Sequence, residues 1–149
     1  SFYDTLTTRY GAKEGDFAMT YVIAHEAGHH VQTLLGVTGQ LNDLRQQVAS
    51  GALSQTEFNR YSVAYELQAD YLAGVVAYYM QQRGYLEQGD LSEAMSAAAA
   101  VGDDVIQQRY QGYVDPDTFN HGTSEQRQAW FKRGFEAGDL SEWDTFQDI

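Results

Sequence analysis

Several residue types and patterns are missing from this chain of 149 residues, and each absence excludes a class of function. The chain has no cysteine, which excludes disulfide bonds, thiolate metal sites and cysteine nucleophiles. A transition-metal site must therefore use histidine and carboxylate ligands. Basic residues are few: 9 lysines and arginines against 21 acidic residues give a formal net charge of −12. Because this charge repels nucleic acids and anionic membrane surfaces, we expect neither as a partner.

Proline and long hydrophobic runs are also scarce. Pro116 is the only proline, no apolar run is long enough to span a bilayer, and no strand-like alternation extends beyond a few residues. We therefore expect no membrane contact from this segment itself. Apolar residues make up 43% of the chain, which is enough to bury a core at about one domain's length. The sequence predicts one mainly α domain over residues 1–149.

Capping residues and glycines indicate where the helices begin and end. Asp16 can cap a first helix and Gly36 can end it, whereas Ser54 and Glu57 have the spacing of a capping box at the start of a second helix. The first two predicted helices cover residues 16–35 and 54–83. A third is predicted to begin at residue 90 or 92 and to extend through GDDVIQQRY, which ends at residue 110, and a fourth to begin at residue 123 or 124. The main loops are predicted at 36–41 and 111–122.

The most distinctive stretch is AHEAGHH, residues 24–30, which holds three of the four histidines and a glutamate. Residues four apart share one face of a helix, so His25 and His29 can direct ring nitrogens at one ion while Glu26 lies beside them. This H-E-x-x-H pattern is typical of a zinc site in which the glutamate is the general base. The alternative is a helix whose histidines are ordinary core or surface residues. His30 has no ligand role beside His29, and we expect it to be packed or to support a ligand.

A catalytic zinc site needs a third protein ligand, and YELQADYLAG, residues 65–74, offers one. Glu66 and Asp70 lie one helical turn apart among apolar neighbours, and buried carboxylates need a cation, a metal or several hydrogen-bond donors. We predict that Glu66 binds the metal and that Asp70 accepts the other ring N–H of a ligand histidine. The alternatives are an exposed acidic pair or a pair bridged to Arg60 or Arg83.

Three motifs, in order, resemble the bacterial family of neutral zinc metallopeptidases: YVIAHEAGHHVQTLLG, YELQADYLAG and HGTSEQRQAWFKRGFEAGD. They span nearly the whole chain. The arrangement is similar to the wider gluzincin class, in which two histidines on one helix and a glutamate on the next bind zinc. The resemblance implies a zincin-like fold with His25, His29 and Glu66 as metal ligands, Glu26 as the general base and Asp70 as the partner of His25.

The same resemblance implies that residues 1–149 are the C-terminal portion of a longer chain. Members of the family usually carry preceding sequence that includes strands of a small β-sheet over the active-site helix and often a membrane anchor. We therefore expect this catalytic domain to lack that upstream sheet. If an anchor or signal precedes it, the protein is expected in the bacterial cell envelope or outside the cell.

The stretch HGTSEQR places His121 and Arg127 six residues apart across a predicted helix start. Integral-membrane zinc endopeptidases related to the CaaX-processing enzymes carry a similar His-to-Arg element late in the chain. This resemblance implies that His121 donates to the developing oxyanion and that Arg127 holds the loop or the substrate. The alternative is a loop histidine without a role and a surface arginine. Asp103 and Asp104 are expected in a solvated bend, or one of them pairs with Arg127.

Together these patterns predict a zinc-dependent peptidase that hydrolyses peptide bonds with a metal-activated water and Glu26 as general base. Its partner is then a peptide or protein substrate. A competing interpretation is a non-hydrolytic zinc-binding module with an interaction or regulatory role. A third is a helical bundle in which His25, His29, Glu66 and Asp70 satisfy one another without metal. Glu26 favours the enzyme, because a structural zinc site has no use for an acid beside a water molecule.

Overall fold

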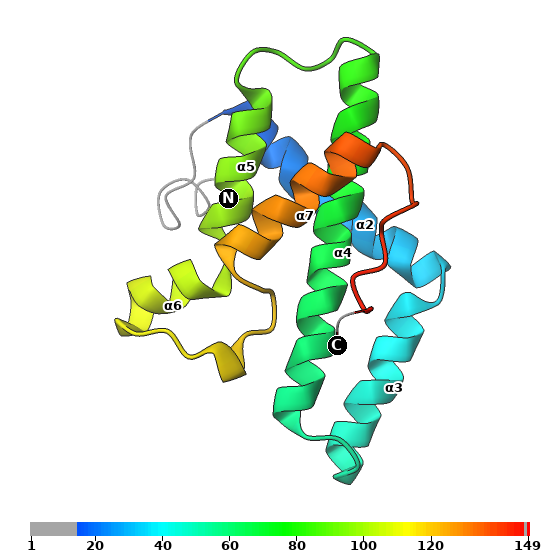
Figure 1. Cartoon of the computed structure of the whole chain (residues 1–149), viewed down its shortest axis with the longest axis vertical. Coiled ribbons are helices and arrows are strands. Elements are labelled where there is room, and N and C mark those ends of the chain that lie inside the picture. Colours follow the sequence, from blue (N-terminus) through cyan, green and yellow to red (C-terminus); the bar gives the residue numbers. More distant parts are fainter. Residues whose placement is uncertain (1–14, 148) are drawn as a thin grey trace.

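The computed structural model describes residues 15–147 and 149, and this part of the chain is helical and contains no strand (Figure 1). The prediction of a mainly α fold is therefore confirmed. None of the described helices combines the length and hydropathy needed to cross a membrane. The elements are α2 (Asp16–Leu34), α3 (Val37–Ser50), α4 (Gln55–Gln82), α5 (Asp90–Ala100), α6 (Asp103–Gln111), the short 3-10 helix η2 (Pro116–Thr118) and α7 (Ser124–Ala137).

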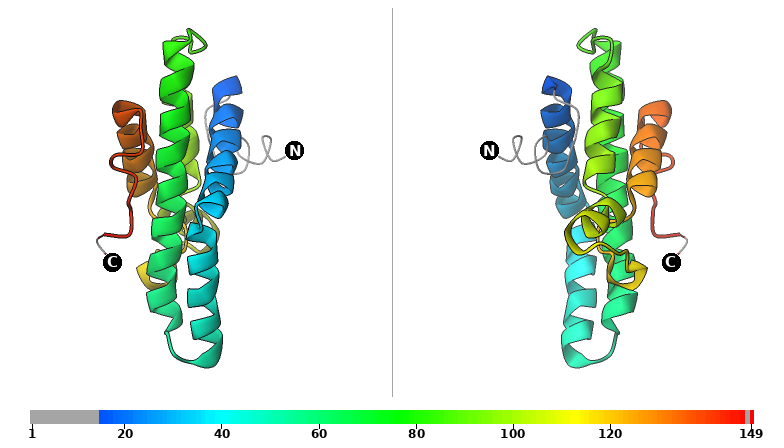
Figure 2. Two further views of the ribbon diagram at one scale, coloured as in Figure 1. Left: turned by 90° about the vertical axis from the view of Figure 1, so that its right-hand side faces the viewer. Right: turned by 90° about the vertical axis from the view of Figure 1, so that its left-hand side faces the viewer.

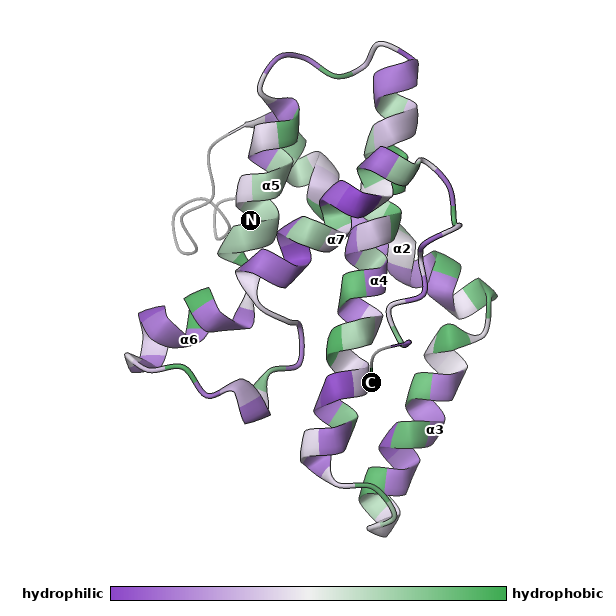
Figure 3. Cartoon of the chain, in the orientation of Figure 1, coloured by the Kyte–Doolittle hydropathy of each residue, from purple (hydrophilic) through white to green (hydrophobic). Residues whose placement is uncertain are grey.

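Helix α4 is the central element of the fold. Helices α2 and α7 lie on opposite sides of it (Figure 2), and α5 packs against both α2 and α7. Helix α3 follows the end of α2 and runs beside the first half of α4 (Figure 1). Hydropathy follows this arrangement, because the packed helix α5 is largely apolar and the peripheral helix α6 largely polar (Figure 3). The core is built from aromatic and alanine side chains that include Phe17, Tyr21, Ala73, Ala97 and Phe131.

Helices α4 and α7 cross at backbone contact, at Gly74 and Gly134. A β-carbon added to Gly74 would collide with the carbonyl oxygen of Phe131, and one added to Gly134 would collide with the backbone of α4. Both positions therefore require glycine. One turn before Gly74 on α4 lies Asp70, and two turns before Gly134 on α7 lies Arg127, so this crossing brings the two charged residues together.

A third glycine lets α2 approach α4 at the predicted metal site. A β-carbon on Gly28 would lie 3.1 Å from the carbonyl oxygen of Ala69, which is tighter than an ordinary contact. Gly28 lies between His25 and His29 on α2, so the close approach is at the level of the histidines. The absence of a side chain here allows the two histidines to reach groups on α4.

The helix starts were largely predicted correctly, and both capping boxes support them. The Ser54 side chain accepts from the N–H of Glu57 at the start of α4, and the Thr123 side chain accepts from the N–H of Gln126 at the start of α7. The first helix differs by one residue: Gly15 is its N-cap, and the side chain of Asp16 makes no capping bond.

Two predictions about the connecting segments are wrong. Residues 36–41 are not a loop: Gly36, with φ 84°, makes a tight turn and α3 begins at Val37. The predicted long third helix is two helices, α5 and α6, because the backbone at Gly102 is extended (φ −67°, ψ 140°). A β-carbon on Gly102 would collide with the backbone nitrogen of Ser124. The chain turns at Gly102 so that the start of α7 can pack against it. The predicted loop 111–122 is confirmed except for Gln111, which ends α6, and it contains the short helix η2.

Candidate metal centre

The three predicted ligands lie together at the interface of α2 and α4. His25, His29 and Glu66 each offer a donor atom within 4.8 Å of the others. The Nε2 atom of His25 is 3.1 Å and that of His29 is 3.5 Å from the same Glu66 carboxylate oxygen. Burial would raise the pKa of Glu66, but hydrogen bonds to the two histidines hold it well below its ordinary value, so the carboxylate is ionised.

The tautomer of His25 is fixed by Asp70, as the sequence had suggested. His25 Nδ1 lies 2.8 Å from Asp70 Oδ1, and an ionised carboxylate can only accept, so the Nδ1 atom carries the proton and Nε2 faces Glu66. Burial lowers the pKa of His25, but its hydrogen bonds to Asp70 and Glu66 raise it to about 9. The two ionised carboxylates, Glu66 and Asp70, therefore favour positive charge around His25.

Asp70 is held in turn by groups that the sequence did not connect to it. Its carboxylate is fully buried and accepts from Arg127 Nε at 2.8 Å, from Arg127 Nη2 at 3.2 Å and from the Tyr21 hydroxyl. Burial would raise the pKa of Asp70, but Arg127 and His25 lower it below its ordinary value. Arg127 and His25 thus keep the Asp70 carboxylate ionised.

Arg127 is itself buried, with 4% of its surface exposed, and its Nη1 donates to the Val101 carbonyl at 3.1 Å. Its carboxylate partner is Asp70. The alternative in which Arg127 pairs with Asp103 or Asp104 is therefore wrong, and so is the one in which Asp70 pairs with Arg60 or Arg83. Burial alone would lower the pKa of Arg127, but the Asp70 charge raises it above its ordinary value. These contacts show that Arg127 holds Asp70, the partner of His25. A role of Arg127 in holding the substrate stays a prediction.

His29 is oriented by a residue that the sequence analysis missed. Its Nδ1 atom lies 2.8 Å from the side-chain oxygen of Gln32, which is completely buried. The Tyr65 ring stacks on the His29 ring, with 4.8 Å between the centroids. Gln32 follows His29 by three residues, so helical spacing was the one signal that could have indicated it.

The donor atoms open into a cavity of about 330 Å³ that contains the remaining predicted residues. Glu26, which is exposed, and His121 both line it, together with the aliphatic side chains of Val22, Val101 and Ile106. The cavity therefore combines the predicted ligands, an acid and an imidazole with an apolar wall.

His121 is placed by Asp103, which does not lie in a solvated bend as expected. Asp103 is buried and its Oδ2 accepts from the backbone N–H groups of Asn120, His121 and Gly122 at 2.7–2.9 Å. Its other oxygen is 3.2 Å from His121 Nδ1. This hydrogen bond raises the pKa of His121, whereas burial opposes the charged form. Asp104 is also engaged, because it accepts from the backbone N–H of Ser124 at 2.7 Å.

His30 was expected to be packed or to support a ligand, and this prediction is wrong. It is exposed, whereas His25 is buried and His29 is half-buried. The reason is helical geometry: His30 is rotated by about 100° from its neighbour His29 and leaves the interface with α4.

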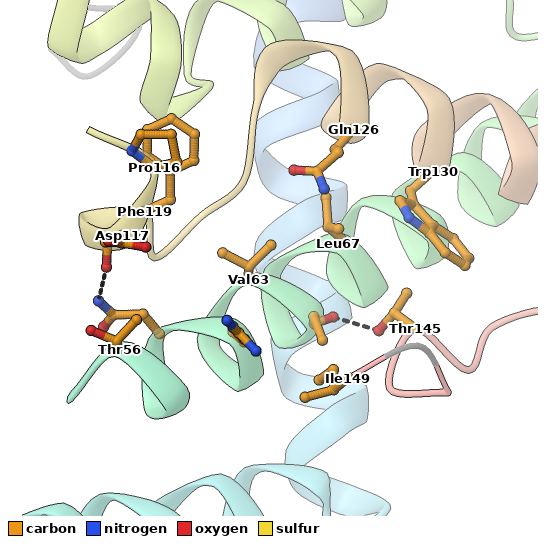
Figure 4. Close-up of a pocket in the computed structure, with 13 residues that line it drawn as sticks. Thr56, Val63, Leu67, Pro116, Asp117, Phe119, Gln126, Trp130, Thr145 and Ile149 are labelled. Carbon is orange, nitrogen blue, oxygen red and sulfur yellow. Dashed lines mark hydrogen bonds between the residues drawn. The ribbon is translucent and has the colours of Figure 1, made fainter. Parts of the chain in front are cut away.

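A second cavity, of about 450 Å³, lies on another face of α4 (Figure 4). It is lined by α4, α7, the segment around η2 and the C-terminal residues, and includes Val63, Phe119 and Trp130. None of its described lining residues is a histidine, and Asp117 is the only carboxylate among them. The nitrogen and oxygen donors that suit a transition metal are therefore in the smaller cavity.

A comparison with protein families identifies the family of this chain. The family model described as "putative neutral zinc metallopeptidase" matches residues 1–146. The chain belongs to this family. The resemblance drawn from the three motifs is thus confirmed, and the family's name implies zinc as the metal.

Curated relatives in this family are longer than the chain. It is 56% identical to the uncharacterized protein YpfJ of Escherichia coli over 98% of the chain and 49% of the relative. It is 46% identical to the uncharacterized protein MT2651 of Mycobacterium tuberculosis over 97% of the chain and 50% of the relative. The chain therefore spans about half the length of these relatives. No solved structure is similar enough to be matched.

Proposed function

We propose that this chain carries the catalytic site of a zinc-dependent peptidase, with a peptide or protein as substrate. The observation that carries the proposal is the convergence of His25, His29 and Glu66 within 4.8 Å, at a cavity that Glu26 also lines. Both histidines have Nδ1 bound to an acceptor, so Nε2 is the atom left for a metal. The name of the family supports the same metal.

The donor set fits zinc in a catalytic site. Two imidazoles and one carboxylate are ligands that zinc accepts, and three protein ligands leave a coordination position open, whereas structural zinc sites use four. When bound, zinc would lower the pKa of water and polarise a carbonyl group. Zinc as the cofactor, with His25, His29 and Glu66 as its ligands, is therefore part of the proposal.

In this proposal Glu26 accepts a proton from the water that attacks the scissile carbonyl carbon. The same carboxylate then delivers that proton to the amide nitrogen as the C–N bond breaks, which yields a carboxylic acid and an amine; transfer of the acid proton to the amine gives the carboxylate and ammonium products. His121, held by Asp103, donates a hydrogen bond to the carbonyl oxygen as negative charge develops on it. Asp70 and Gln32 keep the two histidines in place throughout.

The competing proposal is a zinc-binding module without hydrolytic activity. Glu26 supports the enzyme, because an exposed carboxylate at the cavity serves hydrolysis and contributes nothing to holding a metal that already has three ligands. The test is Glu26→Gln, because glutamine keeps the shape but cannot accept the proton. We expect one zinc per chain in both proteins by elemental analysis, and cleavage of a peptide mixture, detected by mass spectrometry, by the parent alone.

Two results would count against hydrolysis with Glu26 as base. Equal cleavage by metal-loaded parent and variant would require another base. Full zinc occupancy without cleavage by either protein, in this chain and in a longer form that covers the length of its relatives, would favour the non-hydrolytic module.

A further inference from the structure

The two histidines are oriented by different chemistry. His25 donates to the charged carboxylate of Asp70, whereas His29 faces the neutral amide of Gln32. An amide can present either an oxygen or an NH₂ group, so Gln32 could in principle favour either tautomer of His29. What decides between them lies further from the metal centre.

The orientation of Gln32 is fixed by a backbone carbonyl. Its nitrogen lies 2.8 Å from the carbonyl oxygen of Tyr65, which can only accept a hydrogen bond. The NH₂ group must therefore face Tyr65, and the amide oxygen must face His29. Turning the amide over would place two oxygens in contact inside a buried region, where an unpaired polar group is costly.

A second amide and a second carbonyl fix the same polarity. Gln32 also donates to the side-chain oxygen of Gln68 at 2.9 Å, and Gln68 donates to the carbonyl oxygen of Trp143 at 3.2 Å. Gln68 is 2% exposed, so water does not replace these partners. Because the Trp143 carbonyl can only accept, Gln68 cannot turn over either. Its oxygen therefore faces the Gln32 nitrogen, and the Gln32 oxygen faces His29.

We propose that Gln32 and Gln68 are positioning residues that transmit the polarity of two backbone carbonyls to His29. They require the proton on Nδ1 and thereby leave Nε2 as the metal-binding atom. The proposal rests on the zinc site proposed above. It also makes the C-terminal segment part of the support of a metal ligand.

The C-terminal segment is anchored well enough for this purpose. After α7 it runs back along α4 (Figure 1), where Tyr71 donates to the Asp139 carbonyl at 2.9 Å and Thr145 donates to the Ala64 carbonyl. These bonds lie on both sides of Trp143 in the sequence. The carbonyl that Gln68 contacts is therefore held at a defined place on α4.

The first measurement uses the metal-free Glu66→Ala chain, because the ionised Glu66 carboxylate lies 3.5 Å from His29 Nε2 and would itself favour a proton on that atom. Nitrogen NMR of the histidine rings, at a pH where His29 is neutral and with His29→Ala for assignment, should find His29 as the Nδ1–H tautomer. A metal-free Glu66→Ala chain with His29 in the Nε2–H form would overturn the proposal, because no carboxylate then competes with Gln32 for the proton of His29.

The second measurement is zinc affinity, determined by competition with a chelator of known affinity. Gln32→Met keeps approximate size but removes the acceptor, so the tautomer preference should disappear and the affinity should fall about 10- to 100-fold. Gln68→Met removes the more distant amide and should give a smaller loss. Gln128→Met is the matched control. Gln128 lies on α7, outside the chain of hydrogen bonds to His29, and the change deletes a similar bond, from its side chain to the Met95 carbonyl at 3.0 Å.

Gln32→Glu separates positioning from a structural role. Its carboxylate still accepts from His29 Nδ1, but it cannot donate to Tyr65 or Gln68. We expect the Nδ1–H tautomer and near-parental zinc affinity, together with a melting temperature as low as that of Gln32→Met or lower. Zinc affinity that follows melting temperature across these variants, or Gln32→Met with parental affinity, would overturn the proposal. A parent that binds no zinc would instead refute the proposed function, while the tautomer measurement still tests the relay.

Discussion

The buried pair of Arg127 and Asp70 should be among the largest single contributors to stability, and Arg127→Met tests this. Asp70 is fully buried, and Arg127 contributes two of the hydrogen bonds that its carboxylate accepts, at 2.8 and 3.2 Å. Breaking a buried pair by removing one partner costs about 3–5 kcal/mol, because a charge is left without compensation. Because Tyr21 and His25 still donate to Asp70 in this variant, we expect the free energy of unfolding to fall by about 3 kcal/mol.

The assay is urea unfolding of the metal-free protein, with the free energy of unfolding extrapolated to zero denaturant. A loss of that size is a large part of the 5–15 kcal/mol that stabilises typical domains, at order of magnitude. Lys132→Met is the matched control on the same helix. Its pair with Glu136 spans 3.7 Å with both side chains 63% exposed, so the change should cost roughly 0.5 kcal/mol or less.

A double variant sharpens this test. In Asp70→Asn with Arg127→Met no buried carboxylate remains unpaired, so the combined loss should be smaller than the sum of the two single losses. If Arg127→Met were no more destabilising than Lys132→Met, or if the two losses simply added, the argument from an uncompensated buried charge would be refuted.

The other predictions concern the metal centre and its loop. His25→Ala, His29→Ala and Glu66→Ala should each abolish tight zinc binding in elemental analysis, because each removes one of three ligands; full occupancy in Glu66→Ala would refute that assignment. His121→Ala should keep its zinc but lower kcat and kcat/KM together by about 100- to 1000-fold in peptide cleavage, and unchanged kinetics would leave His121 without a catalytic role. The pKa of His121 is raised by Asp103, so the stability that their pair contributes should be present below about pH 6.5 and lost as pH rises through the raised value. Unfolding of the parent and His121→Ala compared across pH 5–9 measures this, and a difference that grows with pH would contradict it.

The sequence predicted those parts of the site that depend on local helical geometry. His25 and His29, and likewise Glu66 and Asp70, lie four residues apart, and this spacing alone places each pair on one face of a helix. The apolar surroundings of Glu66 and Asp70 also indicated that the second pair faces the interior. Assignment of Asp70 to a histidine followed from the need of a ligand imidazole for an acceptor.

The supporting residues could not be predicted in the same way, because their partners are distant in the sequence. Arg127 meets Asp70 across 57 residues, and Gln68 meets Trp143 across 75. Glutamine has no residue pattern that distinguishes a buried bridge from an exposed side chain, so Gln32 gave little signal. Asp103 was misjudged because its partners are backbone N–H groups of a loop 17 to 19 residues later.

These long separations have a consequence for how the protein folds. The hairpin of α3 and α4 can form early, because its contacts are local, but Arg127 can reach Tyr21 only after a loop of 106 residues has closed. The pocket around Asp70 is therefore incomplete in any intermediate that lacks a docked α7. A chain still emerging from the ribosome would hold its histidines, Glu66 and Asp70 without Arg127, which binds the Asp70 carboxylate. The zinc affinity should accordingly reach its full value only when α7 docks, at the end of folding.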